Sequence, residues 1–346
     1  MIECVFTVDY EIYGNGRGSL RDLVLDPAEK LRRIFRKHNA RFVVFPDVAE
    51  LEMIEAQAAD PMIGSVRAQL GRLHSEGFEL GLHIHPWWYA ARRENGTWVL
   101  DQGEYNLCTQ PPPRIVEIVD RAAAYLKGLA ADPGFVPVSF RAGHLLFQPT
   151  RPLADILAAR GIRLDSSVYK GGLWRQHKID YRRAPKTASH WAFRDDVAVP
   201  DPGGIILEVP IHTRQELVWK VMTSKRVGLQ GTGATPAQTG RKLFGRLADY
   251  ARLRYPLKFD LGQMTKEEMV RESERLLEED RKDPSRFRPI VALMHTKDPI
   301  AFDAVDALLD LFGRNGVPIS TFRSIEPKIR AADAAGGTTP SRRILP

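Results

Sequence analysis

Short apolar runs alternate with helix-period segments along almost the whole chain of 346 residues. The runs are brief and partly β-branched, as in buried strands, and they cover residues 5–8, 42–45, 78–82, 136–140, 205–209, 290–294 and 317–321. Strands and helices that alternate about seven times predict a parallel sheet covered by helices. The sheet is either open and doubly wound or closed into a barrel, and an α/β barrel of this length often forms one domain.

Helix start signals lie between these runs. Asp26-Pro27-Ala28-Glu29 places an acid at the N-cap and a proline at the first helical position. Thr265 and Glu268 form a capping-box pattern before residues 269–280. Further helices are expected from Pro113 to about residue 129, and on the apolar stripe of Phe302, Val305, Leu309 and Phe312.

Ionisable residues follow nearly every inner strand. The segments are Asp9-Tyr10-Glu11, His83-Ile84-His85, Arg141-Ala142-Gly143-His144, Asp165-Ser166-Ser167 and His295-Thr296-Lys297-Asp298. In an α/β barrel the carboxyl ends of the strands meet at one face, where the chemistry of such proteins lies. The sequence therefore predicts that these side chains form one site.

The residue types favour a hydrolytic metal centre. His83 and His85 are two apart, so both point to the same side of an extended chain. Two imidazoles and one carboxylate leave an open position on a divalent metal. Asp9 and Glu11 also share a face, so one could ligate the metal while the other acts as a base.

The remaining strand-end residues fit roles around that centre. His295 could protonate a leaving group, Asp165 could orient His295, and Arg141 could hold a catalytic carboxylate ionised. Each residue alone has an ordinary structural interpretation: an Arg141–Asp165 ion pair, for example, or solvated loop acids at Asp9 and Glu11. Their joint occurrence at successive strand ends favours the metal hydrolase.

These segments resemble the five ordered motifs of the polysaccharide deacetylases, carbohydrate esterase family 4. Thr7-Val8-Asp9-Tyr10 is similar to the family's Thr-Phe-Asp-Asp, and residues 79–86, which end in His85-Pro86, are similar to its His-rich motif. The other counterparts are Phe140-Arg141-Ala142-Gly143, Leu164-Asp165-Ser166-Ser167 and Leu293-Met294-His295. Tyr10 replaces the family's second aspartate, which is a metal ligand, and Glu11 is its substitute; the two histidines, usually four apart, are here two apart.

The resemblance implies a fold, an activity and a role for each residue. The fold would be a distorted (β/α)7-type barrel over residues 1–325. Asp9 would be the general base, supported by Arg141, and His295 the general acid, tuned by Asp165. Glu11, His83 and His85 would hold a divalent metal, usually zinc. The substrate would be an acetylated amino sugar or glycan, and the reaction removal of its N-acetyl group.

One segment is unusually basic. Residues 219–259 contain a single acid, Asp249, and nine basic residues: Lys220, Lys225, Arg226, Arg241, Lys242, Arg246, Arg252, Arg254 and Lys258. We expect a basic helical insert at about residues 169–261 that caps the barrel mouth and contacts a phosphate- or lipid-linked substrate, or touches a membrane surface. A solvated basic face is the alternative. Residues 331–346 are expected to form a disordered tail.

Other features limit the classes of function. No stretch approaches the roughly 20 apolar residues of a membrane helix, and Glu3 lies where a signal peptide would be positively charged. Cys4 and Cys108 form no CxxC pair. We therefore expect a cytoplasmic protein that binds no nucleic acid. Two alternatives stay open: a glycosidase-like barrel with two carboxylates flanking the bond, and an inactive sugar-binding protein.

Overall fold

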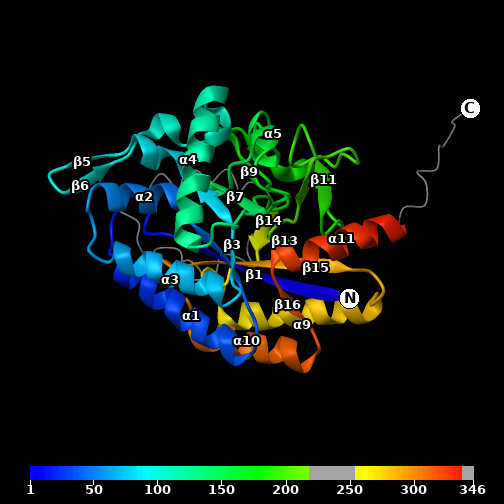
Figure 1. The fold of residues 1–346 in the computed structure, drawn as a ribbon. Coiled ribbons are helices and arrows are strands. Elements are labelled where there is room, and N and C mark those ends of the chain that lie inside the picture. Colours follow the sequence, from blue (N-terminus) through cyan, green and yellow to red (C-terminus); the bar gives the residue numbers. More distant parts are fainter. Residues whose placement is uncertain (218–253, 337–346) are drawn as a thin grey trace, which may run out of the picture.

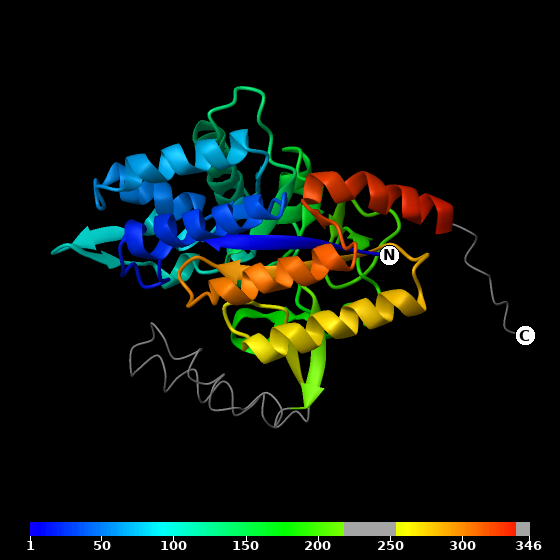
Figure 2. The same ribbon diagram turned by 90° about the horizontal axis from the view of Figure 1, so that it is seen from below.

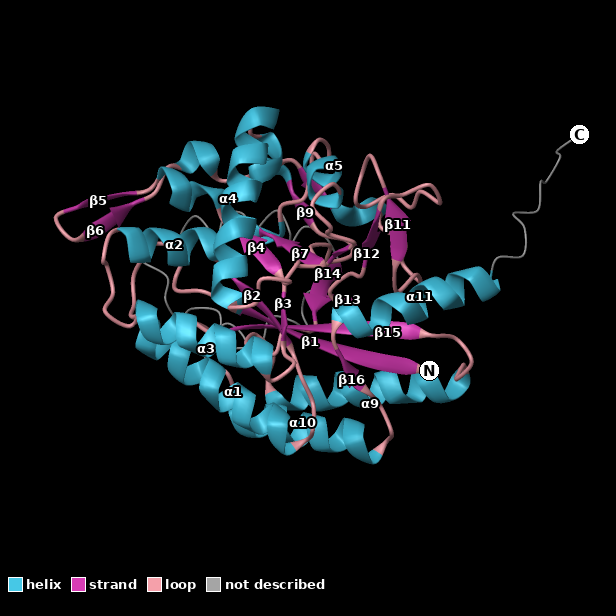
Figure 3. Ribbon diagram, viewed as in Figure 1, coloured by secondary structure: helices cyan, strands magenta, loops and turns pink. Residues whose placement is uncertain are grey.

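The computed structural model describes residues 1–217 and 254–336, and Figure 1 shows its arrangement. Two five-stranded sheets form the centre, and helices cover them. In Figures 1 and 3 the helices α1, α3, α9 and α10 run along the lower side of the strands, and α4 and α5 lie above them. Seen from below in Figure 2, strand β1 lies among the helices, as expected for a buried parallel sheet.

The first sheet has the strand order β15-β1-β2-β3, with β16 paired beside β1. All of its pairings are parallel. Its strands are β1 (Ile2–Tyr10), β2 (Val43–Pro46), β3 (Glu79–Leu80), β15 (Arg288–His295) and β16 (Ile319–Ser320).

The second sheet has the order β11-β12-β8-β7-β4. It is parallel except for the edge strand β11. Its strands are β4 (Leu82–Ile84), β7 (Ser139–Ala142), β8 (Leu164–Asp165), β11 (Trp191–Phe193) and β12 (Ile206–Glu208).

The two sheets meet at both ends. Strands β3 and β4 are one run broken at Gly81, where a Cβ would lie 2.2 Å from the Phe45 ring, and Asp47 bridges to His83 across this break. On the other side Ile211 bridges to Val291 of β15. The strands thus follow one another around a ring as a distorted (β/α)7-type barrel, which confirms the predicted fold class.

Apolar side chains fill the interior of the ring, and helix α11 packs against them at the end opposite the barrel mouth. Alternate residues of each strand point inward: Val5 of β1 and Val291 and Leu293 of β15 belong to one buried cluster with Phe322 and Ile325 of α11. The even-numbered residues of β1 pack instead against the helices. Because successive side chains of a strand alternate between its two faces, Asp9 lies on the same inward face of β1 as Val5.

The four helices predicted from the sequence lie close to their expected positions. The α-helices are α1 (Asp26–Lys37), α2 (Val48–Ala56), α3 (Ile63–Ser75), α4 (Pro112–Ala130), α5 (Leu153–Ala158), α9 (Lys266–Lys282), α10 (Phe302–Arg314) and α11 (Phe322–Gly336). A π-helical turn, Arg21–Leu25, runs into α1, so Asp26 lies inside helical backbone and is not an N-cap. Thr265 forms the predicted capping box with Glu268.

Short antiparallel strand pairs and 3-10 turns lie at the barrel mouth and on its sides. The antiparallel pairs are β5 (Arg92–Glu94) with β6 (Thr97–Val99), β9 (Leu173–Trp174) with β10 (Ile179–Asp180), and β13 (Thr213–Leu217) with β14 (Arg254–Lys258). The 3-10 turns are Pro86–Ala90, Gln102–Glu104, Leu107–Thr109, Gly143–Leu145, Arg175–His177 and Tyr181–Arg183.

Two expectations for the rest of the chain have different outcomes. Residues 218–253 of the predicted basic insert lie outside the described residues, and the described parts of the insert include the paired strands β13 and β14. The expected disordered tail is corrected in part, because α11 continues to Gly336. Its last turns include Ala331, Ala332 and Ala334, and alanine has the highest helix propensity. Among the described helices, none has the length and apolarity needed to cross a membrane.

Candidate active site

Strand pairing brings the predicted residues together at the barrel mouth. Asp9 at the end of β1 is the register partner of His295 at the end of β15. His83 on β4 is the partner of Arg141 on β7 in the same way. Parallel strands end at one edge, so residues far apart in sequence lie side by side. Asp9, Glu11, His83 and His85 are each 5% exposed or less.

Glu11, His83 and His85 form a compact group of three possible ligands. One ligand atom from each residue lies within 4.8 Å of the others. The Glu11 Oε2 atom is 3.2 Å from His85 Nε2 and 3.7 Å from His83 Nε2. Burial alone would raise the pKa of the Glu11 carboxyl, but the charge of Lys297 first, and then the contacts with His85 and His83, hold it well below its usual range. Glu11 is therefore ionised.

The tautomer of His83 also suits a metal ligand. Its Nδ1 lies 2.9 Å from the backbone carbonyl of Arg141, and since a carbonyl only accepts, Nδ1 carries the proton. The buried Nε2 has no hydrogen-bond partner among the described residues and faces Glu11 Oε2 at 3.7 Å. Burial alone would lower the pKa of His83, but Glu11, Asp9 and Asp47 raise it, so a metal ion would take the place of a proton on Nε2. Two imidazoles and a carboxylate fit a divalent metal.

A third histidine, His144, contacts the ring nitrogen of His85 that does not face Glu11. His144 Nε2 lies 3.2 Å from His85 Nδ1, the outer contact that orients a metal-binding imidazole. Burial lowers the pKa of His144 to about 3 and also lowers that of His85 well below its usual value. Both rings are therefore neutral, so one can donate to the other.

Asp9 is held by Arg141 at one oxygen and is open at the other. The buried guanidinium donates from Nη1 to Asp9 Oδ1 over 2.6 Å and from Nε to the carbonyl of Ser166 over 3.0 Å. It also lies over the ring of Phe45, 4.5 Å from the centroid. Asp9 Oδ2 faces His295 Nε2 at 3.5 Å. Arg141 thus fixes the carboxylate, and one oxygen remains for a proton.

His295 lies between carboxylates. Its Nδ1 is 3.2 Å from Asp298 Oδ2, and Asp260, 1% exposed, is close enough to affect its charge. Burial alone would lower the pKa of His295, but the close contact with Asp298 and the charges of Asp298, Asp9 and Asp260 outweigh it and raise that pKa to about 9. His295 therefore carries a proton at neutral pH.

Asp165 lies elsewhere than the sequence suggested. It was expected to orient His295, but its Oδ1 accepts from Ser167 Oγ over 2.7 Å, and its Cα is the register partner of Glu208. Ser167 Oγ in turn accepts from the backbone N–H of Ala142 over 2.9 Å. Asp165 therefore positions the strand end that carries Arg141, and Asp298 takes the place beside His295.

Sequence reasoning missed four acidic or basic residues of this site. Lys297 and Asp298 belong to the strand-end segment that begins at His295, and their charge and position were the available signal, although neither is assigned a role in the predicted site. Glu208 and Asp260 each lie at or just after an apolar run, as Asp165 does, but in a less regular stretch of sequence. Lys297 Nζ donates to Glu11 Oε1 over 2.6 Å.

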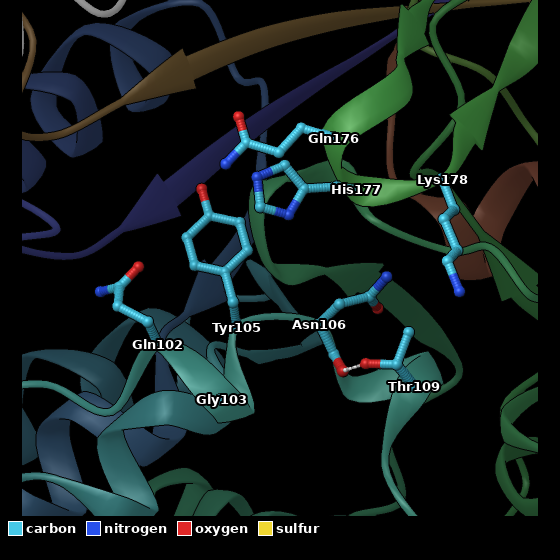
Figure 4. A pocket seen from close by; sticks show the side chains of 8 residues that line it. All are labelled: Gln102, Gly103, Tyr105, Asn106, Thr109, Gln176, His177 and Lys178. Atoms are coloured by element: carbon cyan, nitrogen blue, oxygen red, sulfur yellow. Dashed lines mark hydrogen bonds between the residues drawn. The ribbon is translucent and has the colours of Figure 1, made fainter.

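A cavity of about 170 Å³ opens beside Tyr105 and His177. Figure 4 shows its lining of amide, hydroxyl, aromatic and cationic side chains: Gln102, Gly103, Tyr105, Asn106, Thr109, Gln176, His177 and Lys178. The Tyr105 ring stacks on His144, with centroids 4.2 Å apart, and on His177 at 4.4 Å. The cavity is therefore one aromatic ring away from His144, which contacts the candidate ligand His85.

Comparison with known proteins indicates the same fold. No protein-family profile matches the chain, and no curated protein matches it in sequence. Among solved structures, a polysaccharide deacetylase from Mycobacterium smegmatis is similar, with a TM-score of 0.55 and 13% identity over 100% of this chain and 94% of that one. A GH57 branching enzyme from Thermococcus kodakaraensis has a TM-score of 0.51 and 12% identity, over 94% of this chain and 71% of that one. At these identities the likeness establishes the fold, and the chemistry has to be argued from the site.

Proposed function

We propose that this protein is a metal-dependent hydrolase that removes an N-acetyl or similar acyl group from an amino sugar, free or within a glycan or glycan precursor. The observation that carries the proposal is the arrangement at the barrel mouth. A candidate three-ligand metal site, a carboxylate fixed by Arg141 and a protonated histidine surround one position. These are the groups that amide hydrolysis needs: an electrophile, a base and an acid.

Glu11, His83 and His85 would hold the ion, for which we propose zinc. When bound, such an ion polarises a carbonyl and lowers the pKa of water. The free Oδ2 of Asp9 accepts a proton from the attacking water as its oxygen bonds to the acyl carbon and the carbonyl π pair moves onto oxygen. The C–N bond then breaks while His295 gives the amine nitrogen a proton. The products are a carboxylic acid and a free amine, with one water consumed.

The side chains around the cavity support a polar, hydroxyl-rich substrate. Gln102, Gln176 and Lys178 line this cavity, and Tyr105, which stacks on His144, provides an aromatic wall. Ligand sites commonly combine an apolar wall with a few such polar groups. A sugar that carries the acyl group at the metal site could place its neighbouring groups here.

The glycosidase-like alternative has weaker support from the site. It needs two opposed carboxylates that act on one bond. Asp9 accepts a hydrogen bond from Arg141. Asp165 accepts one from Ser167 and lies beside Glu208. The likeness to a branching enzyme keeps the alternative worth one assay: release of reducing ends from a glycan without added metal would favour it. An inactive sugar-binding protein would bind sugar but no metal.

The test begins with metal content and acetate release. Purified wild-type protein should contain about one first-row divalent metal per chain, and His83→Ala should lose it. Wild-type protein should release acetate from at least one member of a panel of N-acetylated amino sugars and their oligomers. His295→Ala should keep the metal and lose turnover. His74→Ala, on the surface of α3, is the matched control and should change neither. Wild-type protein that takes up no zinc or cobalt would refute the proposal.

A further inference from the structure

Lys297 extends from the end of β15 toward the candidate metal ligands. The residue before it fixes the backbone, because the Thr296 N–H donates to the carbonyl of Asp9 over 3.0 Å and Thr296 is 1% exposed. The Lys297 ammonium then donates to Glu11 Oε1 over 2.6 Å. The other Glu11 oxygen, Oε2, faces the two histidines. The Glu11 carboxylate thus lies between the positive charge of Lys297 and the proposed position of the reaction.

This charge is more available to a substrate than the other cation of the site. Arg141 has no exposed side-chain surface and is bonded to Asp9 and to the carbonyl and hydroxyl of Ser166. The Lys297 side chain is 18% exposed. An ammonium has three N–H bonds, and the contact with Glu11 uses one of them. Donors therefore remain for a second acceptor.

Amide hydrolysis uses such a donor in addition to a metal ion that polarises the carbonyl. Negative charge develops on the acyl oxygen when water adds, and fixed donors aimed at it are usually the largest contribution to catalysis. The Ala142 N–H, next to Arg141, is already taken by Ser167 Oγ. Asp9 and Glu11 are anionic and would repel the developing charge. His295 is required for the leaving nitrogen.

We propose that Lys297 is a catalytic residue whose ammonium donates a hydrogen bond to the oxyanion formed from the acyl carbonyl. This proposal rests on the hydrolase function proposed above. Lys297 transfers no proton in this step: the oxyanion accepts its hydrogen bond, and the lone pair returns to re-form the C=O bond as the C–N bond breaks. The alternative is that Lys297 only neutralises the buried Glu11.

The two roles predict different losses on substitution. Lys297→Met keeps the length and removes the charge, and Lys297→Arg keeps the charge. If Lys297 is catalytic, Lys297→Met should lower kcat about 100-fold, the usual effect of removing one oxyanion donor, with KM, metal content and melting temperature close to wild type. Lys297→Arg should recover a large part of kcat. Lys282→Met, at the exposed end of α9, is the matched control.

A binding measurement provides a readout independent of turnover. The probe is a phosphonamide of glucosamine, whose tetrahedral anionic group mimics the intermediate. Because a catalytic donor binds the transition state better than the ground state, Lys297→Met should weaken this probe about 100-fold and change the affinity for glucosamine little. Two results would overturn the proposal: kcat within about threefold of wild type, or loss of metal or folding in Lys297→Met, which would assign a structural role. If wild-type protein hydrolyses no acylated amino sugar, the proposed function fails as well.

Discussion

His295 has the environment of a general acid because its neighbours favour the charged ring. Asp298 contacts Nδ1 at 3.2 Å and Asp9 faces Nε2 at 3.5 Å. Catalysis needs the proton that this ring holds, so activity should be complete below the His295 pKa of about 9 and should fall as pH rises through it. The alkaline limb of the kcat profile therefore reports on this residue.

Asp298→Asn tests that assignment. The substitution removes a negative charge and an acceptor next to Nδ1, so the pKa of His295 should fall and the alkaline limb should move to lower pH by roughly one unit. The profile is measured as kcat against pH from 6 to 10 with metal content checked at each end. Asp303→Asn, on an exposed acid of α10, should leave the limb in place. An unmoved limb in Asp298→Asn would mean that another group controls it.

At the scale of single residues, the sequence predicts which side chains lie at strand ends but not how the turns after the strands fold. Asp9, Glu11, His83, Arg141 and His295 converge because each ends a parallel strand, and that order can be predicted from apolar runs. The partner of His295 could not be predicted in this way. Asp298 reaches His295 through a tight turn in which its N–H donates to the His295 carbonyl, and turn geometry depends on local backbone angles that apolar periodicity does not report.

At the scale of the elements, strands β8 and β12 carry an acid pair. Asp165 and Glu208 are register partners, both buried, and Glu208 Oε1 accepts from the Val168 N–H. Burial first, then the charge of Asp165, raises the pKa of Glu208 well above its usual value. The folded protein therefore holds a proton there that the unfolded chain releases at the ordinary glutamate pKa of about 4.3. The stability due to this proton is complete at acid pH and is lost as pH rises through the raised pKa.

Glu208→Gln should remove this loss of folding stability at high pH. The glutamine oxygen can still accept from Val168, and its amide can donate to Asp165 at any pH. We expect the variant to unfold with a free energy on the order of 1 kcal/mol higher than wild type at pH 9, and close to wild type at pH 5. Urea unfolding at both pH values measures this. Glu117→Gln, on exposed α4, is the control. An equal decline of stability in both proteins would show that the pair does not share a proton.

The turn after β7 requires a glycine. A Cβ on Gly143 would lie 2.5 Å from the Ile84 carbonyl and 3.0 Å from His85 Cγ. Gly143→Ala should therefore displace the His85 ring, weaken metal affinity at least about 10-fold and cost about 1–3 kcal/mol of stability. Competition with a chromophoric chelator and urea unfolding measure the two effects. Gly64→Ala in α3, with nothing within 4 Å of its Cβ, should instead stabilise by about 0.5–1 kcal/mol. Unchanged metal affinity in Gly143→Ala would exclude His85 as a ligand held by this turn.

The element boundaries show what the sequence could define. Each of the seven apolar runs contains or overlaps a strand, because buried parallel strands are continuously apolar. The break between β3 and β4 was not foreseen: residues 78–82 read as one strand, and only the close approach of Phe45 to Gly81 explains the interruption. Long-range packing of this kind is absent from any local pattern.

For the whole molecule, the candidate metal site joins the two sheets. Glu11 follows β1 of the first sheet, whereas His83 and His85 belong to β4 and its end in the second. Elsewhere the sheets are linked by the bridges at Asp47 and Ile211 and by the shared apolar interior. An ion held by all three ligands would bind the folded barrel and not the unfolded chain. Metal binding should therefore raise the stability of the whole barrel.

The size of this effect follows from mass action. Free zinc at 100 times its Kd should add about 2.7 kcal/mol to the free energy of unfolding, which for a chain of this length corresponds to a rise of a few degrees in Tm. Calorimetry of metal-free and zinc-loaded protein measures the shift. His83→Ala should show none, while His295→Ala should keep it, because His295 is placed as the acid and not as a ligand. If His295→Ala lost the shift and His83→Ala kept it, the ion would instead bind in a group that contains His295, together with either Asp9 and Glu11 or Asp260 and Asp298, and His295 would be a ligand.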